Sequence, residues 1–509
     1  MGEIPRYLSV YYFRGKEMIK IWVTPRSFRI KTTSHLVLDQ THISLFHYLK
    51  PFTEMKWNPA TRSQVVSRHF YYRNPTDGML FLPKYDLPRF LRFLQDRRLE
   101  FEMIPLAPPV GKDVDIPIKE WYQPRNDLQK DAIEHVVNGK GYVRGLSLQP
   151  GAGKTSISLV SAAKLGKRTL IKTPLLVNQW QEAIFKFLDL EPEDVYVLSG
   201  RDSLIHLLSE IDKTLFPKII LASLQTLRPY AQKEPPYDEF LPIEQFTEHV
   251  GIGTIISDEV HLHFHTNFML DLMLNAAVSI PMTATYEVTE KQILPIFNGH
   301  FPSAIRFGEN RYEKYVIVHS FTYHLPAHRL SRTQYKVVTG YNHSLFEKDL
   351  LKKKDLFNKM IENVYYPILE REYFSLHYPG EKLLIICSTV EMCNKLVECL
   401  RKDYKEKLTN PFVAGTKEII KQESDILVAT AKSAAVGFDV PNLLTTFVTI
   451  PIDSPPLNKQ LLGRLRKLPN RNPRLCYAAC LELDSHRKYT QTRAHIFPPL
   501  SKEFYQIQL

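Results

Sequence analysis

One eight-residue stretch limits the fold of this chain more than any other feature. It runs from Leu148 to Thr155 and reads LQPGAGKT, after a short apolar run and before a helical stretch. Glycines in such a loop let backbone N–H groups approach a phosphate closely, and the start of the helix adds a favourable dipole. The loop needs a strand before it and a helix after it, so it predicts a parallel α/β sheet.

The side chains of this loop predict a nucleotide site that uses Mg²⁺. Lys154 is expected to neutralise the β and γ phosphate oxygens, and Thr155 to bind the metal ion. Leu148 replaces the first glycine of the general pattern. This departure is mild, because close approach of the backbone depends on the later positions. The backbone expected to wrap the phosphates belongs to Gly151, Ala152 and Gly153.

Two adjacent carboxylates follow about a hundred residues later. Residues 254–257 form an apolar run, and Asp258 and Glu259 come directly after it. Alone, such a pair would be a solvated turn. Together with the upstream loop it predicts a hydrolytic site, in which Asp258 binds Mg²⁺, partly through water, and Glu259 polarises the attacking water.

The order of apolar runs divides the chain into units. A length of 509 residues exceeds what one hydrophobic core supports. Proline-rich residues 105–111 read as a linker that closes an N-terminal α+β domain, 1–115. Apolar runs at 168–173, 195–199, 218–223 and 254–257 alternate with helical stretches in a unit 116–305. Residues 306–375 are expected to hold a connection and added helices. A second series with runs near 383–387, 426–430, 447–450 and 475–480 fills 376–509.

Composition favours a folded protein with polyanionic partners. Hydrophobic residues make up 44% of the chain, as in an ordinary folded protein. The formal charge is +12, and lysine and arginine gain free energy by releasing counterions from phosphates. No run of about 18 apolar residues and no secretory leader is apparent, so no membrane contact is expected. The cysteines form no CxxC pair and are expected to be reduced core residues: Cys387, Cys393, Cys399, Cys476 and Cys480.

A basic helical face is predicted in the N-terminal domain. Asp86 is expected to cap this helix, and its apolar residues repeat at helical spacing. The opposite face carries Arg89, Arg92, Arg97 and Arg98. Two interpretations stay open, a solvated face and a phosphate-contacting surface, and for Arg89 and Arg92 the second is the functional hypothesis.

Asp258 and Glu259 with His261 form an Asp-Glu-x-His element, which resembles the second signature of superfamily 2 helicases. Further elements follow in that family's order, and their roles are what the resemblance implies. Gln129 would read adenine. His261, Gln460, Thr283 and Thr285 would couple hydrolysis to strand movement. The first-lobe residues that would face a nucleic-acid backbone are Pro174, Gln179, Trp180, Ser223, Gln225 and Thr226.

The second unit resembles the family's fifth and sixth motifs. Residues 430–441 would place Thr430 at nucleic acid, and Gly437 and Asp439 at the nucleotide. Residues 460–467 would bring an arginine to the γ-phosphate, where it stabilises charge on the transferring group. The family spaces its arginines as Gly-Arg-x-x-Arg, whereas this chain has Arg464, Arg466 and Lys467 after Gly463. Either Arg466 reaches the phosphate from a shifted backbone, which we favour, or Arg464 does so and Lys467 fills the third place.

The resemblance implies two tandem RecA-like lobes, an ATP site with Mg²⁺ between them, and a helicase or translocase. Within the superfamily, the chain resembles the branch of phage recombination helicases and the poxvirus transcript-release DNA helicase. DNA is the favoured substrate, and transcription or replication machinery would be a partner. An RNA helicase and a non-hydrolysing nucleotide-gated scaffold are the alternatives. The expected location is intracellular, in a cytoplasmic viral factory if the chain is viral, with packaging in the virion as an option.

Overall fold

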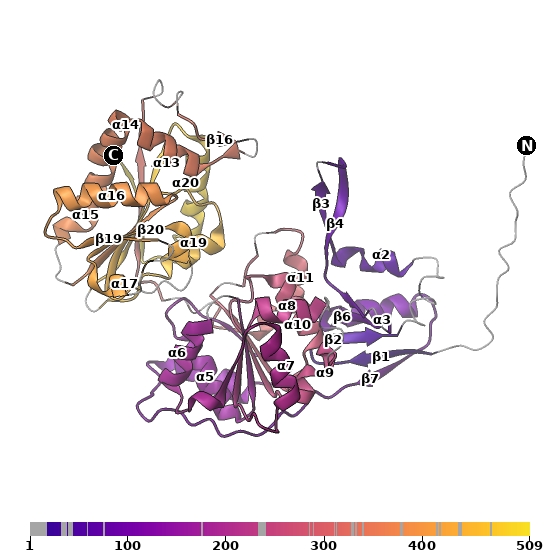
Figure 1. The fold of residues 1–509 in the computed structure, drawn as a ribbon. Helices are drawn as coiled ribbons and strands as arrows, with labels where there is room; N and C mark the ends of the chain where they lie inside the picture. Colours follow the sequence, from indigo (N-terminus) through magenta and orange to yellow (C-terminus); the bar gives the residue numbers. More distant parts are fainter. Residues whose placement is uncertain are drawn as a thin grey trace, which may run out of the picture.

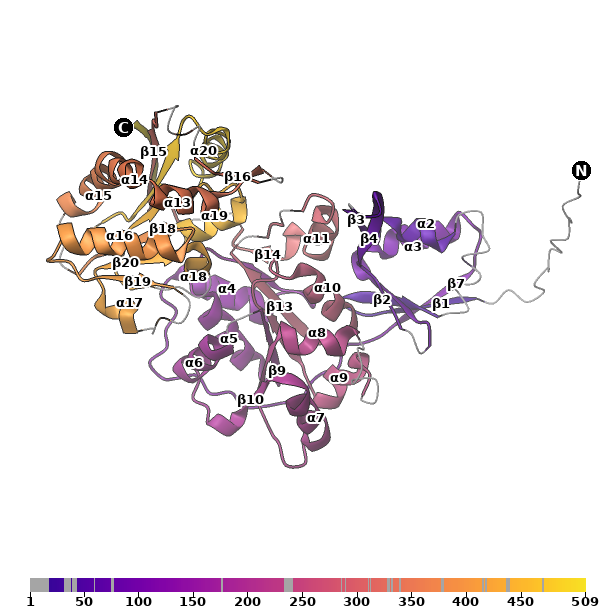
Figure 2. The same ribbon diagram turned by 45° about the horizontal axis from the view of Figure 1, so that its top comes forward.

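The fold comes from a computed structural model of the chain. It describes residues 18–509 except 32–37, 39–43, 59, 75–76, 175–176, 233–240, 285, 289, 310, 312, 327–329, 331–332, 338–339, 377–379, 414–415, 417–418, 436–439 and 469–470. An N-terminal domain lies on one side of a first α/β lobe, and a second α/β lobe lies on the other side (Figure 1). The same order is visible after a 45° turn (Figure 2).

In its described residues, the N-terminal domain consists of a mixed sheet, the helices α2 and α3 and a projecting hairpin. Its sheet has the order β5-β6-β2-β1-β7, in which β1 and β7 are parallel and the other pairs antiparallel. Strands β3 and β4 pair only with each other among the described residues. The elements are β1 (Ile19–Val23), β2 (Ser27–Ile30), α2 (Leu45–Leu49), β3 (Thr53–Asn58), β4 (Ser63–His69), β5 (Tyr72–Arg73), β6 (Leu80–Pro83), α3 (Leu87–Gln95) and β7 (Phe101–Pro105).

The first lobe is a parallel sheet with the strand order β10-β11-β9-β12-β13-β8-β14. Its inner strand β9 is buried along its whole length, as expected for a parallel strand covered on both faces. The strands are β8 (Gly145–Ser147), β9 (Thr169–Thr173), β10 (Val195–Leu198), β11 (Ile219–Ser223), β12 (Thr254–Ser257), β13 (Val278–Thr283) and β14 (Arg306–Phe307). The helices are α4 (Asp127–Asn138), α5 (Lys154–Leu165), α6 (Val177–Phe187), α7 (Gly200–Glu210), α8 (Leu224–Gln232), α9 (Ile243–Val250), α10 (Phe264–Met273) and α11 (Leu294–His300).

The second lobe repeats this plan with the strand order β19-β20-β18-β21-β22-β15-β23. Its strands are β15 (Ile317–Tyr323), β18 (Lys382–Cys387), β19 (Thr409–Phe412), β20 (Ile426–Thr430), β21 (Leu443–Val448), β22 (Arg474–Cys480) and β23 (Glu503–Gln508). Its helices are α13 (His343–Lys352), α14 (Lys354–Met360), α15 (Tyr366–Glu372), α16 (Val390–Asp403), α17 (Ile419–Glu423), α18 (Ala431–Ala435), α19 (Pro455–Leu462) and α20 (Asp484–Ile496). The small pair β16 (Lys336–Val337) and β17 (Gly340–Tyr341) lies apart from this sheet. Short 3-10 turns occur at Lys50–Phe52, Lys84–Asp86, Pro192–Asp194, Ser303–Ile305 and Phe374–Leu376, and a π-helical turn at Ile361–Tyr365.

These sheets confirm the predicted fold class of two tandem RecA-like lobes with a small N-terminal α+β domain. The segment 306–375 does contain helices α13 to α15, but it also supplies β15, which pairs with β22 and β23. The domain boundaries themselves stay predictions. The cysteines are free thiols, and all but Cys399 are buried. None of the described helices is long and apolar enough to cross a membrane.

A buried ionic cluster joins the N-terminal domain to the first lobe. Asp271 of α10 accepts a hydrogen bond from Lys172 Nζ at 2.7 Å, pairs with Arg26 of the N-terminal domain, and contacts His300 Nε2 at 3.0 Å. Burial alone would raise the pKa of Asp271, but the charges of Arg26 and Lys172 overcome it and hold the pKa well below the usual value. Hydrophobic residues of both units surround the cluster in one continuous core. The N-terminal domain is therefore packed firmly on the lobe.

Asp271→Ala is expected to destabilise this junction by about 3–5 kcal/mol, because it leaves two buried cations without a counter-charge. Asp189→Ala is the matched control, since Asp189 pairs with Lys119 while its side chain is 65% exposed; such a pair contributes at most about 1 kcal/mol. Urea unfolding followed by circular dichroism compares the two. An equal shift of the unfolding midpoint in both variants would contradict the assigned role of Asp271.

Candidate nucleotide-binding site

The loop 148–155 has the backbone geometry that its glycines predict. Gly151 and Gly153 have φ of +82° and +93°, in the left-handed region. A Cβ on Gly153 would lie 2.5 Å from Gln129 Nε2, so a side chain could not fit there. Helix α5 begins at Lys154, directly after this turn, and its first N–H groups face the loop. The arrangement forms a cradle suited to a phosphate chain.

Gln129 supports the cradle from the preceding helix. Asn126 caps α4, its side chain accepting from Gln129 N at 3.0 Å. The Gln129 amide donates to Ala152 O at 2.8 Å and accepts from Arg125 N at 2.9 Å. Arg125 in turn donates to Gly151 O at 3.3 Å. Gln129 thus holds the loop in this structure, and its predicted contact with adenine stays a prediction. No motif in the sequence indicated the role of Arg125.

Lys154 and two carboxylates make the charged centre of the site. Lys154 Nζ donates to Leu148 O at 3.1 Å. Burial lowers the pKa of Lys154, while the charges of Glu259 and Asp258 act in the opposite direction. The ammonium therefore contacts the Leu148 carbonyl and lies within the field of two carboxylates, beside the loop that would bind a phosphate.

Asp258 is poorly solvated and lies beside a second carboxylate. Burial, and next the charge of Glu259, raise the pKa of Asp258 to about 7, whereas Trp180 and Lys154 lower it. The Trp180 indole N–H donates to Asp258 Oδ2 at 2.9 Å. A buried carboxylate under such repulsion is stabilised in its ionised form by a cation, so Asp258 and the Thr155 hydroxyl at the start of α5 fit the predicted Mg²⁺.

A hydrogen-bond chain leads from Glu259 into the second lobe. The Thr283 hydroxyl donates to Glu259 Oε2 at 3.0 Å, and His261 Nδ1 lies 2.7 Å from the same hydroxyl. His261 Nε2 lies 3.2 Å from Gln460 Nε2 on α19. Because burial lowers the pKa of His261, the ring is neutral and can donate at Nδ1 while accepting at Nε2. Thr285 lies outside the described residues.

The second lobe places an arginine against the phosphate loop. A Cβ on Gly151 would lie 2.4 Å from Arg466 Nη1, and a Cβ on Gly463 would lie 2.2 Å from Pro150. The charges of Arg466 and Arg464 both act on Lys154. Lys467 instead pairs with Glu313, and its side chain is 64% exposed. The geometry therefore favours Arg466 over the alternative that needs Lys467 in the site.

Gly437 and Asp439 of the fifth motif lie outside the described residues, whereas Thr430 can be placed. Thr430 is the last residue of β20, and its hydroxyl lies 3.0 Å from Ser433 Oγ. In the first lobe Ser223 and Thr226 form the same contact, also at 3.0 Å, at the end of β11. The two lobes thus carry matching hydroxyl pairs at corresponding strand ends. Contact of these pairs with nucleic acid stays a prediction.

Not all residues predicted to face nucleic acid are accessible. Gln179 and Gln225 are exposed, but Pro174 is buried and Trp180 is only 2% exposed. The assignment of Trp180 to a nucleic-acid surface is wrong, because its indole packs inside the lobe and bonds to Asp258. Thr226 is also buried, and its hydroxyl lies 3.4 Å from both Gly200 N and Leu198 O.

The basic face of α3 is partly committed to the N-terminal domain. Arg89 Nε donates to Asp86 Oδ1 at 2.7 Å, and the guanidinium lies 3.9 Å from the centre of the Tyr48 ring. Asp86 makes no side-chain cap at α3, contrary to the sequence-based expectation, because Arg89 and Tyr48 occupy its carboxylate. Arg92 is exposed. Arg92 therefore stays a candidate for a phosphate contact, whereas Arg89 is largely structural.

Comparison with known proteins gives one family model, which covers the first lobe, and solved structures that match most of the chain. Residues 123–288 match the ResIII family model, described as the type III restriction enzyme, res subunit. No curated protein matches the chain. The structure of UvsW from phage T4 is similar over 97% of this chain and 99% of that one, at 13% identity and a TM-score of 0.35. The structure of the Pyrococcus furiosus Hef helicase domain is similar over 72% of this chain and 98% of that one, at 17% identity and a TM-score of 0.42. The structure of S. cerevisiae Dbp5 bound to RNA and ADP BeF3 is similar over 83% of this chain and 93% of that one, at 11% identity and a TM-score of 0.45.

Trp180→Phe is expected to weaken binding of magnesium and ATP near neutral pH and much less at pH 9. The smaller phenyl ring keeps only part of the packing and loses the N–H donor, so the pKa of Asp258 rises above about 7 and less of the ionised form is available. Above that pKa the carboxylate is ionised in both proteins. Titration with a fluorescent ATP analogue across this pH range measures the difference. Trp121→Phe is the control, since Trp121 is 58% exposed. A weakening that is independent of pH would refute the explanation.

Proposed function

We propose that this chain is an ATP-dependent motor of helicase superfamily 2 that couples ATP hydrolysis to movement along nucleic acid. The observation that carries the proposal is the contact of both lobes at one phosphate loop, with Arg466 beside Gly151. A nucleotide between the lobes would make their relative position depend on hydrolysis. This dependence is what a nucleic-acid motor requires.

The residues of the site divide the chemistry between them. The loop backbone and Lys154 bind the phosphates, and Glu259 orients the attacking water and takes up its proton. Thr155 and Asp258 would hold Mg²⁺, which supplies positive charge at the phosphate oxygens when bound. Arg466 stabilises the charge that develops on the transferring group. Gly437 and Asp439 are proposed to contact the nucleotide from the second lobe.

Coupling to nucleic acid follows from the hydrogen-bond chain between the lobes. Glu259 reaches Thr283, Thr283 reaches His261, and His261 reaches Gln460 on α19. A movement of the second lobe therefore changes the position of the carboxylate that orients water. The hydroxyl pairs at Ser223 and Thr430 lie at the ends of corresponding β-strands in the two lobes. A nucleic-acid strand bound to both pairs would therefore be displaced when the lobes move.

DNA is the proposed substrate, in replication, repair or transcript release, and RNA is the alternative. The net charge of +12 supports either polyanion. We further propose that the chain belongs to the poxvirus transcript-release type, as found in African swine fever virus, and acts in a cytoplasmic viral factory with the transcription or replication machinery. A non-hydrolysing scaffold is less well supported, because Glu259 and Arg466 both reach the phosphate loop region.

Steady-state ATP hydrolysis tests the proposal directly. The wild-type protein is expected to hydrolyse ATP faster with nucleic acid, and single-stranded DNA, duplex DNA and RNA are compared. Lys154→Ala should abolish turnover by removing phosphate binding. Glu259→Gln should bind ATP normally but lose at least about a hundredfold in rate, as expected for loss of a general base. Normal hydrolysis by Glu259→Gln would exclude this role, and a response to RNA alone would favour the alternative.

A second comparison tests which basic residue acts at the γ-phosphate. Arg466→Ala should lower kcat by about a thousandfold or more, in the range for removal of an arginine finger. Lys467→Ala should have little effect, because Lys467 pairs with Glu313 at the surface. ATP affinity is measured alongside to separate binding from catalysis. A larger loss of kcat for Arg464→Ala than for Arg466→Ala would assign the finger to Arg464 instead.

A further inference from the structure

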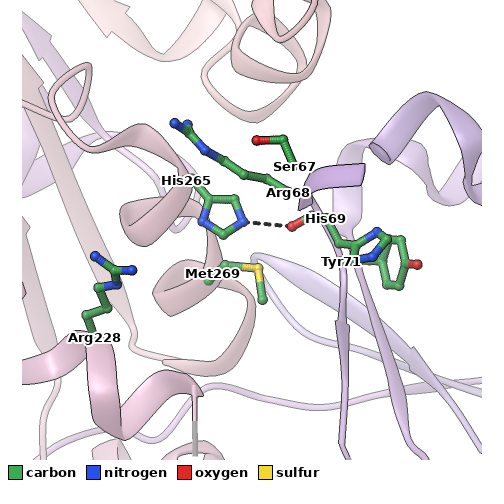
Figure 3. A pocket seen from close by; sticks show the side chains of 7 residues that line it. All are labelled: Ser67, Arg68, His69, Tyr71, Arg228, His265 and Met269. Atoms are coloured by element: carbon green, nitrogen blue, oxygen red, sulfur yellow. Dashed lines mark hydrogen bonds between the residues drawn. The ribbon is translucent and has the colours of Figure 1, made fainter. Parts of the chain in front are cut away.

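A basic pocket lies where the N-terminal hairpin meets the first lobe. Its volume is about 440 Å³. Arg68 and His69, at the end of β4, line one side, and Arg228 of α8 and His265 of α10 line the other. Figure 3 shows Arg68 on the hairpin side and Arg228 on the lobe, with His265 between them in this view. The pocket thus brings together cationic side chains from segments about 160 residues apart.

A second cavity adjoins the pocket and reaches His261. It has a volume of about 340 Å³, shares Arg68, Arg228 and His265 with the pocket and is also lined by His261 and His263. We name the two adjoining cavities together the hairpin groove. It runs from the root of the β3–β4 hairpin to His261, the residue that contacts Thr283 and Gln460.

The hairpin end of the groove is lined by the side chains of Arg68 and Arg228. Burial lowers the pKa of His265, and the nearby charges of Arg68 and Arg228 lower it as well. Glu54 offsets part of this charge, with Arg68 Nε 3.4 Å from Glu54 Oε2, but that carboxylate is only 5% exposed. Glu290 also lines the groove at the His261 end. The accessible charge at the hairpin end therefore favours an anion.

The walls of the groove are held in place by packing. His265 Nε2 donates to His69 O at 2.8 Å (Figure 3). Phe70, the next residue, packs on Phe264 and Phe268 of α10 with ring centres 5.8 Å and 5.4 Å apart. Helix α10 begins only a few residues after Glu259. A ligand in the groove would therefore contact the segment that carries the catalytic carboxylates.

We propose that the hairpin groove binds the phosphodiester backbone of nucleic acid through Arg68 and Arg228. The proposal rests on the proposed function, and it moves the contact of the N-terminal domain from the α3 face to the root of the hairpin. Arg68 and Arg228 line the groove from the hairpin and from the lobe, and guanidinium groups are well suited to contact phosphates. Arg228 also lies on α8, the helix that follows Ser223 at the end of β11. A nucleic-acid strand that contacts Ser223 would therefore continue into the groove.

A nucleic acid explains the groove better than an acidic protein segment. The lining is charged and polar rather than apolar, and protein interfaces bury an apolar centre. Beyond the groove the hairpin also exposes Trp57, at 59%, together with Val65 and Val66. An exposed indole can stack on bases, which is a common supplement to phosphate contacts. The hairpin is thus suited to continue the same contact away from the lobe.

The test compares two double variants of equal charge. Arg68→Gln with Arg228→Gln removes the groove cations, and Arg92→Gln with Arg98→Gln removes two exposed arginines on or next to α3. Fluorescence anisotropy of labelled single-stranded and duplex DNA and RNA is measured over a salt series without ATP, so the result does not depend on hydrolysis. The groove variant is expected to bind about tenfold or more weakly. The slope of log affinity against log salt concentration should become less steep by about two, because two phosphate contacts are lost, whereas the α3 variant should change less in both quantities.

The outcomes separate this site from the proposed function. Unchanged affinity and salt slope in the groove variant, with tight binding by the wild type, would overturn the groove as a binding site while leaving the motor intact. A loss only in the α3 variant would do the same and return the contact to that face. Groove-dependent binding by a wild-type protein that hydrolyses no ATP would support the groove and count against the motor. Thermal melting of each variant verifies folding, and Arg68→Lys with Arg228→Lys should recover most of the affinity.

Discussion

The crowding of charge around the phosphate loop is the constraint on which the rest of the site depends. Asp258 is buried beside Glu259, and this raises the pKa of Asp258 to about 7. Two adjacent carboxylates remain ionised only when cations compensate them. The charge of Lys154 and the hydrogen bond from the Trp180 indole N–H compensate part of the negative charge. The negative charge that is left explains why the site suits a divalent cation. The centre is arranged for a ligand rather than for its own stability.

The same centre is connected to distant parts of the chain by fixed contacts. Toward the second lobe, Thr283 and His261 link Glu259 to Gln460, and Arg466 lies against Gly151. Toward the N-terminal domain, α10 follows Asp258 and Glu259 and carries Asp271, whose buried ion pairs hold the two units together. In the proposed motor, ATP hydrolysis and nucleic-acid binding would therefore influence each other through short paths on both sides of the first lobe.

The departure from the usual arginine spacing has a simple structural consequence. Arg466 is one residue nearer to Arg464 than the family pattern predicts, yet it reaches the phosphate loop. Helix α19 ends at Leu462, and the residues after it form turns rather than a continued helix. Side-chain direction after a helix end is set by the turn rather than by helical spacing. Lys467 consequently points to Glu313 at the surface.

The sequence by itself determined what depends on neighbouring residues. A glycine-rich loop between a strand and Lys154, and a carboxylate pair after an apolar run, identified the lobe type and the centre of the site, because these patterns are local. Only the tertiary structure decided which distant residues meet there. It placed Trp180 on Asp258 and added β15 to the second sheet. It also set Arg466 beside Gly151 and Lys467 beside Glu313, and it brought Arg68 and Arg228 to the same pocket. The physical reason is that such contacts depend on packing between segments that are far apart in the chain, and local sequence patterns carry no record of that packing.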